Sequence, residues 1–445
     1  MGWKWRNLTG ASVSLPESKI LPPARNQTET KKAMKHSYII LRKASNTTTF
    51  DSTFGGPLIP GPVTSMAAES SQPATVILPK IEIEELELNQ VAKVRRYNDV
   101  IGAAPNMPVR LIKPTDAVPS DSDGNGMFSD TDSTWGIQAV GADKCSLEGE
   151  GMTAAVLDTG IDRSHPAFAG MNIVEKDFSG EDNGDTNGHG THVAGTIFGQ
   201  DVNGIRIGVA RKIERALIGK VLGKNGGGTK ETFEAIQWAM NSGANVISMS
   251  LGIDFPGFVA ELTNEGFPTD LATSFALEGY RTNVLLYERL AEFMKQQANF
   301  MQTCIIVAAA GNENRKFQNP DWDISVAPPA VAAGIVSVGA LARSSNGLIP
   351  AGFSNSGPNV VGPGVGVLSA MSGSQDLTQM NGTSMATPHV AGVTLLRAQQ
   401  LLANGQLSPQ FLEAKISASA MTTILARGFQ AADVGLGLIQ TPQFA

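Results

Sequence analysis

Short apolar runs alternate with glycine-led helical stretches from residue 135 to the end of the chain. The apolar runs are residues 153–157, 216–221, 246–250, 305–309 and 335–338. Continuous β-rich runs of this length are typical of strands that are buried on both faces of a parallel sheet. The pattern predicts an α/β fold with a doubly wound, mostly parallel sheet, whose functional residues lie at the carboxyl ends of the strands.

The first 134 residues divide into three parts with different patterns. Residues 1–35 are polar and aperiodic, which predicts a flexible tail. Residues 36–114 predict a small α+β module. Its strand candidates are residues 38–41, 75–78 and 109–112, and its helix candidate is residues 88–100. Residues 115–134 are acidic, rich in Gly and Ser and nearly free of apolar residues, which predicts a linker.

Composition excludes several classes of protein. The net charge is −7 and no cluster of Lys and Arg stands out, so nucleic acid is not an expected partner. No apolar stretch is long enough for a membrane span, and no signal peptide is visible, so we expect a cytoplasmic or non-classically exported protein. The only cysteines, Cys145 and Cys304, are predicted to be buried free thiols.

Three segments each place a polar side chain where such a sheet would present it. Asp158 ends an apolar strand, His189 lies at the mouth of a predicted helix, and Ser384 begins an apolar helix that runs to about residue 402. Taken singly, a turn aspartate and an N-cap serine explain two of them. The histidine has two simple explanations, a structural role or a metal site shared with His192 at i, i+3.

Together the three residues supply a nucleophile, a base and an orienting carboxylate, the set that activates a weak hydroxyl nucleophile. The start of a helix also favours negative charge on the serine oxygen, because its N–H groups are unpaired. A fourth segment delivers Asn312 after an apolar strand. With the backbone N–H of Ser384, its amide is a candidate donor to an oxyanion.

In chain order, the motifs DTGID, GHGTHVAG, AAAGNE and GTSMATPHVAG resemble those of the subtilisin-like (subtilase) serine peptidases. The resemblance covers residues 135–445, including WGIQAV before the first motif and VGLGLIQ near the end. It implies a subtilisin-type fold, Asp158 as the orienting carboxylate, His189 as general base and acid, Ser384 as nucleophile and Asn312 as oxyanion donor.

The resemblance, and not the spacing, selects His189 over His192 as the base, and it leaves His192 and His389 with structural roles. All four site residues are present, which disfavours a non-catalytic binding protein on the same scaffold. The implied activity is endopeptidase hydrolysis of polypeptide substrates through an acyl-enzyme on Ser384. The alternative is a peptide cyclase or transpeptidase that passes the same acyl group to an amine.

The resemblance also implies a substrate-binding strand and pocket. Ser250, Leu251 and Gly252 match a strand that pairs with an extended peptide. Pro329 matches a proline that lines the primary specificity pocket, and Ala327 lies near its floor, which indicates a roomy apolar pocket.

Residues 36–114 resemble the inhibitory prosegment of this family in position and order, so the chain's own prosegment is an expected partner. The linker, residues 115–134, is then the region of a processing site, with self-cleavage expected between about residue 113 and Trp135. The interval from Gly252 to Ala308 is longer than in most relatives, and this insertion is expected to border the cleft.

The chemistry so implied needs no cofactor, and structural calcium is a further option. Residues 199–208 do not match the family's usual calcium loop. The linker holds a weak metal-site candidate, because the spacing of four residues echoes an EF-hand loop. These residues are Asp121, Asp123, Asn125 and Asp132. The flanks lack helices, so a flexible acidic linker is favoured.

Overall fold

The structure is a computed structural model, and it describes residues 35–43, 79–116, 128, 130–297, 302–316, 318–319 and 321–442. Residues 1–34 of the predicted tail, the strand candidate at residues 75–78 and most of the predicted linker lie outside the described residues, whereas Lys35, the last residue of the predicted tail, begins a strand. No described helix combines the length and the apolar character that crossing a bilayer requires.

The centre of the fold is a mostly parallel sheet of eight strands with the order β13-β12-β11-β9-β5-β7-β6, in which β14 also pairs with β12. Only the β12–β13 pairing is antiparallel. The strands are β5 (Thr153–Asp158), β6 (Ile173–Asp177), β7 (Arg215–Lys220), β9 (Val246–Met249), β11 (Ile305–Ala309), β12 (Ile335–Ser344), β13 (Gly347–Pro350) and β14 (Val360–Pro363). All five predicted apolar runs form strands of this sheet, which confirms the predicted α/β class.

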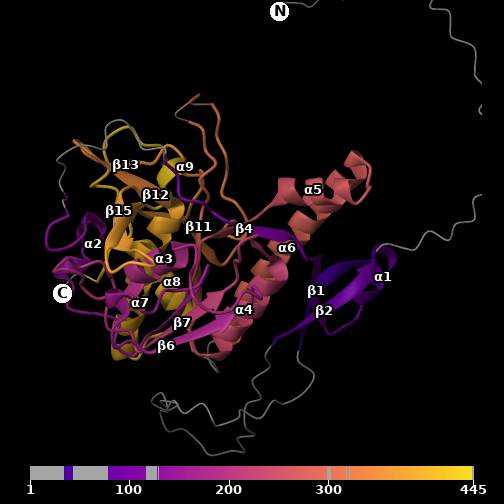
Figure 1. Cartoon of the computed structure of the whole chain (residues 1–445), viewed down its shortest axis with the longest axis horizontal. Coiled ribbons are helices and arrows are strands. Elements are labelled where there is room, and N and C mark those ends of the chain that lie inside the picture. The colour runs from indigo at the N-terminus through magenta and orange to yellow at the C-terminus, as the bar shows by residue number, and fades with distance from the viewer. Residues whose placement is uncertain are drawn as a thin grey trace, which may run out of the picture. The chain divides into compact units, whose positions relative to one another are not determined.

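Helices cover both faces of the sheet, as the continuous apolar strands require. One face packs against α3 (His189–Phe198), α7 (Thr383–Ala403) and α8 (Pro409–Ser419), and the other against α4 (Thr229–Asn241) and α6 (Thr269–Gln297) (Figure 1). In β11, Val307 belongs to the first core, whereas its neighbours Ile306 and Ala308 belong to the second. Alternation along each strand therefore fills two separate cores.

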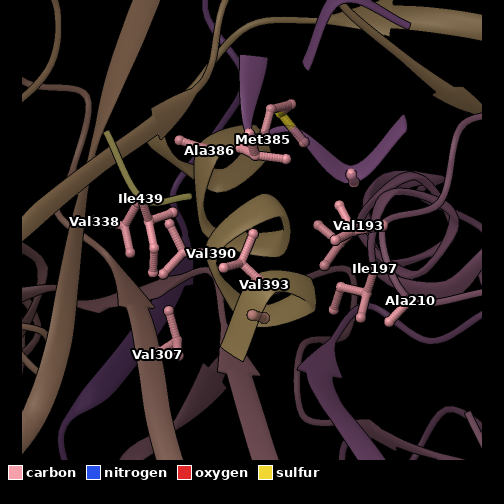
Figure 2. Close-up of a cluster of buried hydrophobic side chains, with 14 of the residues drawn as sticks. Val193, Ile197, Ala210, Val307, Val338, Met385, Ala386, Val390, Val393 and Ile439 are labelled. Carbon is pink, nitrogen blue, oxygen red and sulfur yellow. The ribbon is translucent and has the colours of Figure 1, made fainter. Parts of the chain in front are cut away.

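Helix α7 runs through the first core. Figure 2 shows Val390 and Val393 of this helix between Val307 and Val338 of the sheet on one side and α3, with Val193, on the other. The smaller elements around this core are α2 (Trp135–Ala139), α9 (Ala431–Val434) and the antiparallel pair β15 (Val367–Ala370) and β16 (Leu377–Met380). Because α7 is packed on all sides, its first turn is held in a fixed place.

The N-terminal module is a three-stranded antiparallel sheet with the order β2-β1-β3 and one helix. Its elements are β1 (Lys35–Lys43), β2 (Pro79–Glu87), α1 (Leu88–Val94) and β3 (Val100–Pro105). The predicted strand at residues 38–41 lies within β1. The predicted helix at 88–100 is too long, because the chain turns after α1, and Asp99 there pairs with Arg42 of β1 at 2.9 Å.

The chain next contributes a strand to a second small sheet. Strand β4 (Pro108–Leu111) lies between β10 (Leu251–Ile253) and β8 (Gly227–Gly228) and is antiparallel to both. Arg110 is opposite Gly252 in this sheet. The predicted strand at 109–112 is therefore correct to within one residue at each end.

The long interval between Gly252 and Ala308 contains α5 (Phe255–Asn264) and α6. Helix α6 contacts the N-terminal module, where Asn283 Nδ2 donates a hydrogen bond of 2.9 Å to the carbonyl oxygen of Pro105. Helix α5 begins directly after β10. The insertion therefore borders the strand that pairs with β4, and it also packs against the module.

Both cysteines are free thiols, but they differ in burial. Cys304 is buried, and its burial raises the pKa of the thiol above its usual range. The prediction of two buried thiols is wrong for Cys145, which is half-buried, with Sγ 3.5 Å from the carbonyl oxygen of Pro442.

Two histidines lie fully inside the fold. His192 Nε2 faces the carbonyl oxygens of Val367 and Thr378 at 3.0 and 3.2 Å, and His389 Nδ1 faces that of Met385 at 2.9 Å. Burial lowers the pKa of His192 to about 3 and that of His389 to about 4, from 6.5. Both rings are therefore neutral at pH 7, as structural groups would be.

These depressed pKa values predict acid destabilisation. Below pH 6.5 the two imidazoles bind protons in the unfolded chain but stay neutral in the folded chain. The stability that is present at higher pH is therefore lost as the pH falls. Between about pH 6 and 4, the two rings together should lower the unfolding free energy by up to about 2.7 kcal/mol per pH unit. Urea unfolding of Ser384→Ala protein at several pH values measures this slope. His389→Gln should lower the measured slope by up to about 1.4 kcal/mol per pH unit, the share of one ring, and an unchanged slope would contradict the assignment.

Candidate active site

Asp158 ends β5 and His189 begins α3, and their side chains meet. His189 Nδ1 lies 2.8 Å from Asp158 Oδ1, and both side chains are about 1% exposed. A carboxylate only accepts, so Nδ1 carries the hydrogen and Nε2 of a neutral ring is left as an acceptor. Among the described residues, Nε2 has no hydrogen-bond partner. The ring is therefore oriented and tautomerically fixed, with a free basic nitrogen.

A second aspartate, Asp185, fixes the loop before α3. Its Oδ1 accepts hydrogen bonds from Thr159 Oγ1 at 2.9 Å and from Gly188 N at 2.8 Å, and its Oδ2 accepts from Thr191 Oγ1 at 2.6 Å. Thr159 directly follows Asp158, and Thr191 lies two residues after His189, so Asp185 ties the two motifs together. The sequence analysis missed Asp185, although its place three residues before a glycine is typical of an aspartate that caps a turn.

Ser384 is the second residue of α7, whose N-cap is Gly382. The N-cap explanation for Ser384 is therefore wrong. Its side chain is fully buried, and Oγ donates a hydrogen bond of 2.9 Å to the carbonyl oxygen of Ile112, just after β4. The hydroxyl thus lies against the backbone of the N-terminal segment, at the positive end of a long helix.

Asn312 lies beyond the carboxyl end of β11. Its Oδ1 accepts hydrogen bonds from the backbone N and from Oγ1 of Thr383, both at 2.9 Å, which fixes the amide's orientation. Its Nδ2 donates to the carbonyl oxygen of Lys113 at 2.9 Å. Thr383 thereby aims a neutral donor into the cleft, and the sequence analysis assigned it no role, although it directly precedes Ser384 in the GTSM motif.

The residues expected to bind substrate pair with the N-terminal segment. Leu251 and Gly252 pair with β4, and Ser250 accepts a hydrogen bond of 3.2 Å at its carbonyl oxygen from Ile112 N. On the other side of Ser384, Asn381 Nδ2 donates to the carbonyl oxygen of Thr115 at 2.9 Å. Residues 109–115 therefore lie along the cleft as an extended peptide.

The Ile112 side chain is buried next to Gly252. A β-carbon on Gly252 would lie 3.7 Å from both Ile112 Cγ1 and the carbonyl oxygen of Pro328. That same oxygen accepts a hydrogen bond from Ile253 N at 3.0 Å. Pro328 thus joins the segment that contains Ala327 and Pro329 to strand β10, next to the buried side chain of Ile112.

The metal-site candidates are not brought together in the described residues. Asp121, Asp123 and Asn125 lie outside them, and the backbone oxygen of Asp132 accepts from Arg206 N at 2.9 Å. Across the described ranges, no three His, Cys, Asp or Glu side chains gather as a metal site would need. The linker site therefore stays a prediction.

In the loop that departs from the family's calcium loop, the guanidinium of Arg206 donates to the carbonyl oxygens of Gly208 and Val209 at 3.2 and 3.1 Å. A cationic side chain thus satisfies two buried backbone acceptors of this loop.

Comparisons with known proteins place this geometry in a family. The model of the subtilase family matches residues 149–437, more than half of the chain. M-protease of Shouchella clausii (strain KSM-K16) is 35% identical over 275 residues, which cover 60% of this chain and 60% of that protein. Subtilisin Savinase of Lederbergia lenta is 34% identical over 275 residues, which cover 60% of this chain and 84% of that protein.

The "Intracellular serine protease" of Paenibacillus polymyxa is 32% identical over 301 residues, which cover 65% of this chain and 79% of that protein. The match to M-protease spans only about 60% of that relative's length. The family match itself extends over the segments that carry Asp158, His189, Asn312 and Ser384. The chain therefore belongs to the subtilase family of serine peptidases.

Proposed function

We propose that the chain is a serine endopeptidase in which Ser384 attacks a peptide carbonyl and forms an acyl-enzyme. The observation that carries the proposal is the contact between Ser384 Oγ and the backbone of a peptide held antiparallel to the substrate strand. Ser384 Oγ lies 2.9 Å from a peptide carbonyl oxygen, and the chain also holds an oriented His–Asp pair. Acyl transfer needs both a hydroxyl placed at a peptide group and a base that such a pair supplies.

Each group has a defined role in the proposed reaction. His189 takes the Ser384 proton on Nε2 and later passes it to the leaving amine. Asp158 accepts from Nδ1 and stabilises the imidazolium. Asn312 Nδ2 and the backbone N–H of Ser384 donate to the oxyanion of the tetrahedral intermediate. The acyl group is then released by water.

The described arrangement is a resting one. Ser384 Oγ donates to the carbonyl oxygen of Ile112, whereas Asn312 Nδ2 donates to that of the next residue, Lys113. Attack on the Ile112 carbonyl carbon requires Ser384 Oγ to turn to His189 Nε2, and the Ile112 oxygen to replace the Lys113 oxygen at Asn312. The two donors are therefore occupied by two successive carbonyls, which supports an inhibitory role for this segment.

Residues 36–114 act, in this proposal, as an inhibitory prosegment that the enzyme removes itself. Strand β4 fills the cleft, and the rest of the module is anchored on α6 through Asn283. Since Ile112 lies at Ser384, the proposed bond to be cut is Ile112–Lys113. This bond lies just before the range predicted from the sequence, and cutting it would end the prosegment at residue 112 instead of 114. Polypeptide substrates would later occupy the same strand position. The cellular location stays a prediction.

The first prediction from the proposed function concerns the nucleophile. A fluorophosphonate should label Ser384 and abolish peptidase activity, because the His–Asp pair activates this hydroxyl alone. Peptide mapping of the labelled protein by mass spectrometry measures the site. A metal chelator should leave the chemical step unchanged. Labelling confined to another serine would contradict the proposal, and so would a loss of activity in the chelator that added zinc restores.

The second prediction concerns the oxyanion donor. Asn312→Ala should lower kcat by about 10²–10³ and change KM little, the range known for removing this kind of donor from subtilisin, itself a member of the family. Steady-state kinetics on one peptide substrate measures both constants. The control is Asn346→Ala in the exposed β12–β13 turn, which should match the wild type. An unchanged kcat in Asn312→Ala would exclude this residue from the oxyanion site.

The third prediction concerns self-processing. Purified wild-type protein should yield two fragments, one ending at Ile112 and one beginning at Lys113, whereas Ser384→Ala should remain a single 46.7 kDa chain. Intact-mass spectrometry distinguishes the two results. If Ser384→Ala is cut at the same bond in a protease-deficient host, or if the wild type stays whole and fully active, the prosegment assignment fails.

A further inference from the structure

An ion pair joins the N-terminal segment to the insertion beside the cleft. Arg110 Nε of β4 lies 2.5 Å from Asp254 Oδ2, in the residue that links β10 to α5. The side chain of Asp254 is only 12% exposed, whereas that of Arg110 is 66% exposed. The carboxylate is therefore a fixed part of the cleft wall, and the arginine reaches it from the surface.

The Asp254 side chain is held by the helix that follows it. Its Oδ1 accepts a hydrogen bond of 3.0 Å from Gly257 N and so caps α5. Among the described residues, Oδ2 is buried, makes no hydrogen bond and has only the ion pair with Arg110. Removal of the N-terminal segment would take away this counter-charge and leave a carboxylate, held in place by the α5 cap, with which the cationic side chain of another peptide could pair.

The strand register shows which substrate position would lie next to Asp254. Ile112 lies at Ser384, so Leu111 is the second residue and Arg110 the third before the bond to be cut. Arg110 is opposite Gly252, and Asp254 N donates to the carbonyl oxygen of Pro108 at 2.8 Å. Any polypeptide that takes the place of β4 in this register brings its third side chain to Asp254.

The surface next to Asp254 is also acidic. A hollow of about 570 Å³ between β4 and α5 is lined by Arg110 together with two exposed carboxylates, Glu261 on α5 and Glu265 at its C-cap. Among the described residues that line it, Arg110 carries the only positive charge. The field in this hollow therefore favours a cationic side chain over a neutral or an acidic one.

We propose that Asp254 is a specificity-determining residue, and that the enzyme prefers substrates with arginine three residues before the scissile bond. The chain's own Arg110 occupies this subsite before processing. The inference rests on the proposed peptidase function and adds to it a class of substrate: extended polypeptides with a basic side chain at that place and an apolar residue at the bond.

The first test is kinetic and uses processed wild-type protein. The probes are two synthetic decapeptides, one with the sequence of residues 107–116 and one identical except for Gln in place of Arg110. We expect kcat/KM to be about fivefold higher for the arginine peptide, because a partly exposed ion pair contributes up to about 1 kcal/mol. The ratio should fall as the salt concentration rises.

Two variants assign the preference to one carboxylate. Asp254→Asn keeps an acceptor oxygen for the α5 cap but removes the charge, so it should bring the ratio close to one. Asp270→Asn is the matched control, because it removes one charge from the first turn of α6 in the same insertion. It should keep the wild-type ratio. A ratio near one in the wild type, or a full ratio in Asp254→Asn, overturns the proposal.

The second test needs no catalysis and uses the full chain with Ser384→Ala. Hydrogen exchange at the amides of β4 reports how firmly the segment is held. Arg110→Gln and Asp254→Asn should each speed exchange a few-fold, and the double variant no more than either alone, because both remove the same interaction. Additive effects, or no effect of Asp254→Asn, would contradict a direct pair.

The two tests separate failure of this inference from failure of the proposed function. Processed protein that digests casein but cuts both peptides equally well is a peptidase without this subsite. Protein that digests neither casein nor peptides is not the proposed peptidase, and in that case the exchange experiment alone decides whether Asp254 binds an arginine in the cleft.

Discussion

Because both faces of the central sheet are covered by helices, its strands can present polar groups only where they end. Strand β5 ends at Asp158, and β11 leads to Asn312 at the same edge. The helices α3 and α7 begin at this edge with His189 and, one residue in, Ser384. The sheet thus gathers four groups that are far apart in the chain without any dedicated framework for the site.

Burial then makes the arrangement rigid. Asp158 and His189 are almost completely excluded from solvent, so each needs the other to avoid an uncompensated polar group. The same holds for Asp185, which accepts hydrogen bonds from the loops on both sides of the pair. Loss of one partner would therefore disturb both the fold and the arrangement of the site, whereas Ser384 Oγ donates to the carbonyl oxygen of Ile112 in the N-terminal segment.

The sequence was sufficient for the sheet, and it was sufficient to name the four candidate site residues, because each lies in a local pattern of an apolar strand or helix with small residues beside it. The sequence was insufficient where contacts between distant segments determine the end of an element or the role of a residue. The helix predicted to residue 100 ends at Val94, since Asp99 is drawn to Arg42 across the module. Thr383 is hydrogen-bonded to Asn312, and Asp254 forms an ion pair with Arg110. The two residues of each pair are more than 70 positions apart, so no local pattern in the sequence reveals these roles.

Strand β4 occupies the middle position between β10 and β8. Neighbouring strands lie about 4.8 Å apart, so β10 and β8, with β4 between them, stand about 10 Å from each other. A slot of that width accepts one extended chain with hydrogen bonds on both sides, but not a helix, which is about 10–12 Å across with its side chains, nor a hairpin. Any chain segment that took the place of β4 would therefore have to be locally extended, whatever its side chains.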